Sequence, residues 1–293
     1  MLRSLSMTST LDCLPCFTRQ AVDLARSATD DPEEQERLAR RFLKSLSELD
    51  WRPSSPAVAQ RLHRIARPLL PDEDLWQTAK VEFNRMALRR LPEARRRVRE
   101  SSDSFGAALR MAAAANVIDF GVTRHLTEEE VTRELDRCLE LPLEGDPAEL
   151  RDAVDRAARI LYIADNAGEI VFDRLVLEHL PRRKVTLAVR GQPVLNDATR
   201  EDAETAGISD LVEVIDTGSD APGILLDDCS AEFRDAFEKA DLILAKGQGN
   251  LESLLGGPRE VFFLLKVKCD IVARQLGCRT GDLALYHYVP KRS

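Results

Sequence analysis

The stretch I-L-Y-I-A-D-N-A-G-E, residues 160–169, decides the fold. Its first four residues are apolar without alternation, which is typical of a strand buried on both faces of a parallel sheet. An acid, an amide and a glycine follow almost at once, and this change predicts that the strand ends in a polar turn. The stretch therefore predicts the first strand of a sheet that is covered by helices on both sides.

The same pattern recurs through the rest of the C-terminal half. Short apolar runs predict strands at residues 160–164, 185–189, 211–215, 242–245 and 261–267. The segments between and after these runs predict helices at residues 169–179, 199–206, 231–239 and 268–276. Strands that alternate with helices indicate a doubly wound, mainly parallel α/β fold. We expect this domain to occupy residues 151–293.

The N-terminal half has a helical pattern instead. Leu38, Phe42 and Leu46 recur at helical spacing, as do Phe83 and Met86, so each set predicts one buried helix face. Prolines separate the apolar stretches and predict helix boundaries. We expect a helical subdomain over residues 1–150.

Composition narrows the class of protein. The chain has 293 residues, 44% of them hydrophobic, and a net charge of -8, which disfavours a nucleic-acid binder because such proteins neutralise phosphates with Lys and Arg. No apolar run is long enough to span a bilayer, and residues 1–20 lack the apolar core of a signal peptide. The sequence predicts a cytoplasmic protein without a membrane or nucleic-acid partner, and it gives no oligomeric state.

Three polar segments follow predicted strands and are candidates for a functional site. They are residues 165–169, 190–197 and 246–250, and each contains glycine. The carboxyl ends of parallel strands meet at one edge of a sheet, where ligands bind. Asp165, Asn166 and Asp197 offer the oxygen ligands that Mg²⁺ or Mn²⁺ prefers.

The third segment complements the first two. Lys246 and the backbone N–H groups around Gly247 and Gly249 are suited to a phosphate. Each segment also has a purely structural interpretation as a helix N-cap or a tight turn. Spacing alone leaves both interpretations open.

The six cysteines form no dense disulfide pattern, but Cys13 and Cys16 make a C-x-x-C motif. Such a pair can bind a metal, form a redox pair or serve only as structural thiols. The residues do not choose among these alternatives.

Six motifs together resemble the damage-control phosphatase family, in its compact microbial branch. They are D-N-A-G-E at 165–169, R-G-Q-P-V-L-N-D-A-T at 190–199, K-G-Q-G-N-L-E-S-L at 246–254, D-C-L-P-C-F-T-R-Q at 12–20, A-N-V-I-D-F-G at 115–121 and F-F-L-L-K-V-K-C at 262–269. The resemblance implies a helical region packed on a Rossmann-like domain. It also implies hydrolysis of small phosphorylated metabolites with a divalent metal such as manganese, cobalt or nickel.

The resemblance implies roles for individual residues as well. Asp165, Asn166 and Asp197 would bind the metal, and Lys246 would bind the phosphate and, with these three, form the catalytic group. The residues implied in substrate binding or loop orientation are Asn116, Asp119, Glu169, Arg190, Gly247, Gly249 and Asn250. Cys13, Cys16 and Cys269 all fall inside these motifs, so we expect a second, thiol site.

Other functions compete with that of a phosphatase that uses a metal-activated water. A haloacid-dehalogenase-type enzyme would need an acid where Ala167 stands, and an S-adenosylmethionine-dependent methyltransferase would need more glycines than D-N-A-G-E supplies. A non-catalytic sugar-phosphate sensor stays open, as does attack by Asp165 itself as a nucleophile.

Overall fold

The computed structural model describes residues 7–70, 74–117, 133 and 136–291. Within these residues one sheet of seven strands has the order β1-β7-β6-β5-β2-β3-β4. The strands are β1 (Leu143–Glu144), β2 (Ile160–Ile163), β3 (Val185–Val189), β4 (Glu213–Asp216), β5 (Leu242–Lys246), β6 (Val261–Lys266) and β7 (Leu283–Tyr288). All neighbours pair in parallel except β6 and β7, which pair antiparallel. The predicted mainly parallel α/β fold is confirmed.

The strand order has a switch point at its centre. From β2 the chain proceeds outward to β3 and β4, and it then returns to the other side of β2 to form β5 and β6. Loops that leave β2 and β5 therefore separate to opposite faces, which opens a crevice at the carboxyl ends of these two strands.

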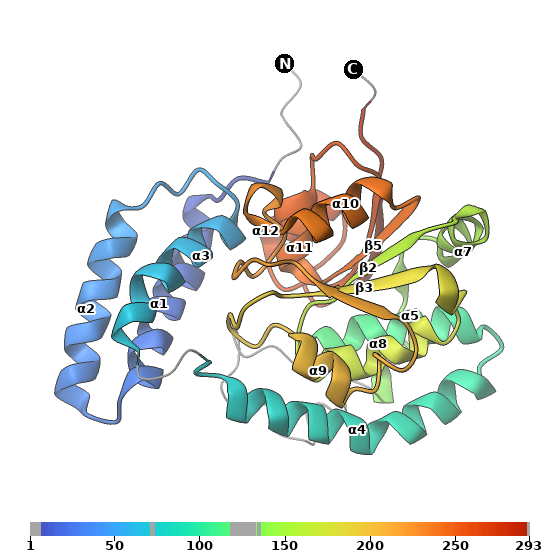
Figure 1. The fold of residues 1–293 in the computed structure, drawn as a ribbon, viewed down its shortest axis with the longest axis horizontal. Coiled ribbons are helices and arrows are strands. Elements are labelled where there is room, and N and C mark those ends of the chain that lie inside the picture. Colours follow the sequence, from blue (N-terminus) through green and yellow to red (C-terminus); the bar gives the residue numbers. More distant parts are fainter. Residues whose placement is uncertain (1–6, 71–73, 118–132, 134–135, 292–293) are drawn as a thin grey trace.

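Helices cover both faces of the sheet (Figure 1). One face packs against α4 (Gln77–Glu100), α5 (Ser104–Ala114), α8 (Glu169–Leu177) and α9 (Arg200–Thr205), and these share one large apolar core with it. The other face packs against α10 (Ala231–Lys239), α11 (Gly247–Leu254) and α12 (Asp270–Leu276) in a second core. The strands are apolar on both sides because each side has its own core. Helix α7 (Pro147–Arg156) joins β1 to β2.

The first three helices form a group beside the sheet, at the left of Figure 1. They are α1 (Leu14–Ala28), α2 (Pro32–Glu48) and α3 (Ser55–Ala66). Leu38 and Phe42 are buried in a core of this group alone, as their spacing predicts. Because α4 and α5 belong to the core of the sheet instead, the division at residue 150 stays a prediction. None of the described helices is long and apolar enough to cross a membrane.

Three local predictions differ from the structure. The strand predicted at 211–215 lies at Glu213–Asp216, because the amides of Leu211 and Val212 close a turn onto the carbonyl of Ile208. Residues 246–250, predicted as a polar segment after a strand, are the end of β5 and the first turn of α11. Strands β1 and β7 were not predicted.

Candidate functional site

A cavity of about 210 Å³ lies at the carboxyl edge of the sheet, at the switch point. The segments after β2, β3 and β6 and the first two turns of α11 form its base, and the starts of α1 and α3 close it from the helical group. This volume is smaller than the ~300–1,000 Å³ of typical drug-sized pockets. It suits a small metabolite.

The structure brings together the three predicted metal ligands. Asp165, Asn166 and Asp197 are buried and line this cavity. Asn166 pairs with Asp197 in an isolated antiparallel bridge, and the amide of Ala198 donates to the carbonyl of Asp165 over 2.8 Å. The loop after β3 is thereby held against the loop after β2 by backbone hydrogen bonds.

Arg190 joins the same acids from the end of β3. Its Nε donates to Asp197 Oδ2 over 2.6 Å, and its Nη2 lies 3.5 Å from Asp165 Oδ1. Its Nη1 donates to Asn250 Oδ1 over 3.0 Å, while the Asn250 amide donates to the carbonyls of Ala164 and Lys246. Arg190 and Asn250 are fully buried, and these bonds connect the ends of β2, β3 and β5; substrate binding by either residue stays a prediction.

Glu169 and Asn116 hold Asp165 and Asn166, the first two predicted ligands, in place. Each of two amide nitrogens, Asn116 Nδ2 and Asn166 Nδ2, donates both to Asp165 Oδ2 and to Glu169 Oε2, over 2.6–2.9 Å. The Asn166 carbonyl oxygen therefore points away from these acids. Asn116 Oδ1 is buried, and within the described part of the chain it has no hydrogen-bond partner. Asp119 lies outside the described residues.

Lys246 lies beneath the cavity and has no exposed surface. Its ammonium donates to Glu169 Oε1, Asp173 Oδ1 and the Ala112 carbonyl over 2.6, 2.7 and 3.0 Å. Burial disfavours its charge, but the charges of Asp173 and Glu169 outweigh this and raise the Lys246 pKa. The ammonium thus serves as the counter-ion of two buried acids. Phosphate binding by Lys246 stays a prediction, and it would require the ammonium to leave these partners.

The acids of the site carry an excess of negative charge. Burial raises the pKa of Asp165 well above its usual range, and the neighbouring Glu169 and Asp197 raise it further, against the cations Lys268 and Arg190. A divalent cation would relieve this repulsion, and oxygen donors are the ligands it prefers. The residues therefore fit a metal ion of the magnesium or manganese kind.

Gly247 lets α11 begin against Asp165. Its φ is +75°, and a Cβ at this position would lie 1.8 Å from Asp165 Oδ2, so no larger residue fits without displacing the acid. Among the described residues no side chain caps the first turn of α11. Its N–H groups are thus available to an anion beside the three predicted ligands.

Among the polar cavity residues that sequence reasoning did not identify, three are connected by hydrogen bonds. Gln248 and Glu252 come from α11, and Lys268 follows β6. Gln248 Nε2 donates to Glu252 Oε1 over 2.8 Å, and the Lys268 amide donates to Gln248 Oε1 over 3.2 Å. All three residues stand inside motifs quoted above, so the sequence did contain a signal for them. A motif does not show, however, which of its side chains point into the cavity.

The three motif cysteines line the same cavity. Cys13 and Cys16 come from the start of α1, Cys269 precedes α12, and none is in a disulfide. Burial raises the pKa of Cys16, with smaller contributions from Cys269 and Cys13. In the part of the chain that the structure describes, however, no three His, Cys, Asp or Glu side chains are grouped to hold a metal. The function of these thiols stays a prediction.

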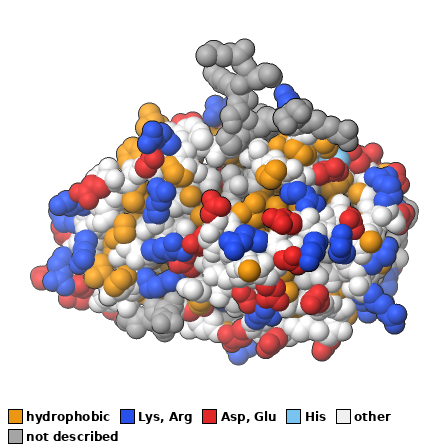
Figure 2. Space-filling model, turned by 45° about the horizontal axis from the view of Figure 1, so that its top comes forward, with side chains coloured by type: hydrophobic (Ala, Val, Ile, Leu, Met, Phe, Trp, Pro, Cys, Tyr) orange, Lys and Arg blue, Asp and Glu red, His pale blue; other side chains and the backbone are white. Residues whose placement is uncertain are grey.

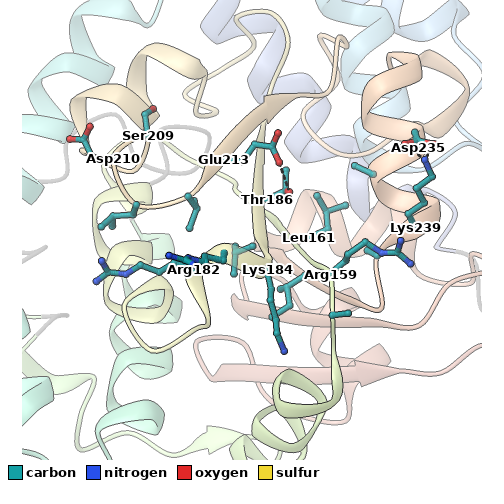
Figure 3. Close-up of a pocket in the computed structure, with 18 residues that line it drawn as sticks. Arg159, Leu161, Arg182, Lys184, Thr186, Ser209, Asp210, Glu213, Asp235 and Lys239 are labelled. Atoms are coloured by element: carbon teal, nitrogen blue, oxygen red, sulfur yellow. Dashed lines mark hydrogen bonds and ion pairs between the residues drawn. The ribbon is translucent and has the colours of Figure 1, made fainter.

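A second, larger hollow of about 710 Å³ lies at the opposite, amino edge of the sheet (Figure 3). Its charged side chains, among them Arg159, Arg182, Lys184 and Lys239, are exposed, and Lys239 pairs with Asp235 over 2.7 Å. None of the predicted site residues lines it. On the molecular face in Figure 2, charges of both signs are interspersed.

Fold and site together define a doubly wound α/β protein with an acid- and amide-lined cavity at the switch point of its sheet. Residues 9–284 match the family described as "Damage-control phosphatase ARMT1-like domain". The chain belongs to this family, as the sequence motifs indicate.

Three relatives extend over nearly the whole chain. This chain is 36% identical to the damage-control phosphatase of Archaeoglobus fulgidus. The match covers 92% of this chain and 96% of the relative. The chain is 35% identical to damage-control phosphatase PH1575 of Pyrococcus horikoshii (93% and 95%) and 37% identical to the uncharacterized protein MJ0202 of Methanocaldococcus jannaschii (94% and 93%). The crystal structure of PH1575, described as a DUF89 family protein, superposes with a TM-score of 0.85 at 34% identity, covering 96% of this chain and 99% of that one.

Proposed function

We propose that the chain is a metal-dependent phosphatase that hydrolyses small phosphorylated metabolites. One observation carries the proposal: Asp165, Asn166 and Asp197 converge beside the start of α11 in one small cavity. Two relatives that match over more than nine-tenths of the chain bear the name damage-control phosphatase, which supports the same reaction.

In this proposal Asp165, Asn166 and Asp197 hold one divalent cation, Mn²⁺, Co²⁺, Ni²⁺ or Mg²⁺. When bound, such an ion polarises a phosphoryl oxygen and favours attack by water. The chain itself positions the substrate. Arg190 and Glu169 fix the ligand side chains from either side, and the N–H groups at the start of α11 face the phosphate.

Lys268 supplies positive charge on the cavity wall. It lines the same cavity as Asp165, and its charge lowers the pKa of that acid, so it would also attract a phosphoryl group bound there. Lys246 contributes from below as the counter-ion of Glu169 and Asp173, while Glu169 Oε2 accepts from both amide nitrogens. Catalysis would then be mainly positioning and electrostatic stabilisation.

A phosphatase assay tests this function. Purified protein with Mn²⁺ or Co²⁺ should release phosphate from p-nitrophenyl phosphate and from small sugar phosphates. Asp165→Ala should reduce kcat by about 10³-fold. It removes both a proposed metal ligand and the acceptor of hydrogen bonds from two side-chain amides. An inactive wild type that still binds sugar phosphates would support a non-catalytic sensor instead.

A further inference from the structure

One wall of the cavity carries an acid that the mechanism above does not use. Glu252 lies on the second turn of α11 and lines the same cavity as Asp165 and Asn166. It is half-buried, and its hydrogen-bond partners are the neutral side chains of Gln248 and Ser55. An acid with such partners, facing a site for a phosphorylated ligand, needs an explanation.

The direction of the helix places this acid near the phosphate site. Helical side chains lean toward the N-terminus of their helix, so Glu252 reaches back over the first turn of α11. The 2.8 Å bond between Gln248 Nε2 and Glu252 Oε1 fixes it there. This is the turn that begins at Gly247, against Asp165. The carboxyl group and the uncapped N–H groups thus lie at the same level of the helix.

The surroundings of Glu252 favour its protonated form. Burial raises the pKa of Glu252. Hydrogen bonds from Gln248 and Ser55 and the charge of Lys268 lower this pKa, but by less than burial raises it. The carboxyl therefore keeps its proton to higher pH than an exposed glutamate does. Burial also raises the pKa of Cys16 and Cys269, the thiols that interact with Glu252 from α1 and from the start of α12.

We propose that Glu252 is the catalytic acid that donates a proton to the leaving-group oxygen, a role that rests on the proposed phosphatase function. As the P–O bond to the leaving group breaks, the Glu252 O–H bond breaks and an alcohol forms. Water supplies the new oxygen of inorganic phosphate and gives up one proton to solvent, and the Glu252 carboxylate takes a proton back. The reaction needs no co-reactant other than water. A substrate with an alkoxide leaving group depends on this proton, because an alkoxide is too strong a base to leave unprotonated.

Two substrates of similar shape separate this role from a structural one. p-Nitrophenyl phosphate releases a weakly basic phenolate, and benzyl phosphate releases a strongly basic alkoxide. In Glu252→Gln we expect kcat to fall by about 10²-fold or more on benzyl phosphate and by less than about tenfold on p-nitrophenyl phosphate. The wild type should also lose benzyl phosphate activity at high pH, and this alkaline limb should be absent in the variant. The charged or titratable groups Lys268, Cys16 and Cys269 interact with Glu252, and the variant keeps all three.

Matched variants control for the substitution itself. Glu232→Gln, at an exposed position on α10, should leave both rates unchanged. Glu252→Asp retains a carboxyl group and should recover part of the benzyl phosphate activity, and melting curves of both Glu252 variants report on folding. Equal losses on the two substrates, or no recovery in a folded aspartate variant, would overturn the role of Glu252 alone. A wild type inactive on both substrates would overturn the phosphatase function, and this role with it.

Discussion

Each edge of the sheet carries a hollow. The larger hollow has an exposed, charged rim, and the smaller one contains the buried polar side chains. The amino-edge hollow has about 710 Å³ and is rimmed by exposed charges, whereas the carboxyl-edge cavity has about 210 Å³ and rests on buried Asp165, Asn166 and Asp197. Burying polar groups costs free energy unless they are paired, so such groups collect where function requires them. Buried polar side chains, and not volume, therefore distinguish the carboxyl edge as the candidate functional edge of this sheet.

The same substitution at each edge should have very different effects on stability. Lys246→Met leaves Glu169 and Asp173 buried without their counter-ion, so we expect the free energy of unfolding to fall by about 3–5 kcal/mol. Lys184→Met, at an exposed position of the amino-edge hollow, removes one hydrogen bond to the Ala157 carbonyl and should lower it by about 1 kcal/mol or less. Urea denaturation of both variants measures the difference. Equal losses at the two edges would contradict the comparison.

Two glycine substitutions distinguish the effect of backbone strain from the effect of displacing Asp165. Gly247 and Gly277 share a φ of +75°, but a Cβ at Gly277 would meet nothing within 4 Å. Gly247→Ala and Gly277→Ala should each lower the free energy of unfolding by about 1–2 kcal/mol through backbone strain. Only Gly247→Ala also displaces Asp165, so it alone should lower phosphatase activity, by about 10²-fold. If Gly277→Ala lost as much activity, strain rather than the position of Asp165 would be responsible.

A smaller effect is expected where the helical group meets the carboxyl edge. Asp220, in the loop after β4, accepts hydrogen bonds from Gln60 and Arg64 of α3 and lies 3.1 Å from Arg67. Burial raises the Asp220 pKa, but the hydrogen bonds from Arg64 and Gln60 and the charges of both arginines outweigh this and lower it.

A carboxyl whose pKa is lower in the folded state stabilises the fold above its unfolded pKa, and this contribution is lost as the pH falls through the folded value. Asp220→Asn should therefore cost about 1 kcal/mol near neutral pH, since Arg64 is half-exposed and solvent screens the pair. Urea denaturation between pH 7 and pH 3 should show the cost shrinking as the pH falls. Asp210→Asn, exposed at the amino edge, is the control. A cost that does not change with pH would exclude this electrostatic origin.

The sequence predicted those strands whose side chains are almost all apolar. Runs at 160–164, 185–189, 242–245 and 261–267 match β2, β3, β5 and β6 within a residue, because a strand buried on both faces has few polar positions, such as Thr186 and Lys266. The strand at Leu143–Glu144 is too short to form a pattern. The helix after Lys246 was missed because two glycines in its first turn resemble a loop.

The candidate site was predicted in part for an equally physical reason. Parallel strands end at one edge, so the positions of Asp165 and Asp197 along the chain were enough to place them together. Side-chain direction is not encoded this way. Lys246 belongs to the same strand end, yet it points below the cavity to Asp173. Glu252 was not identified, because its place depends on how α11 and α3 pack.

Direct titration with Mn²⁺ tests whether Asp165, Asn166 and Asp197 share one cation. Calorimetry on the wild type should show one strongly bound ion per chain. Replacing Asp165 and Asp197 together by Asn should weaken binding by at least about 10²-fold, whereas Glu213→Gln at the amino edge should leave it unchanged. Undiminished binding in the double variant would contradict the shared-cation site.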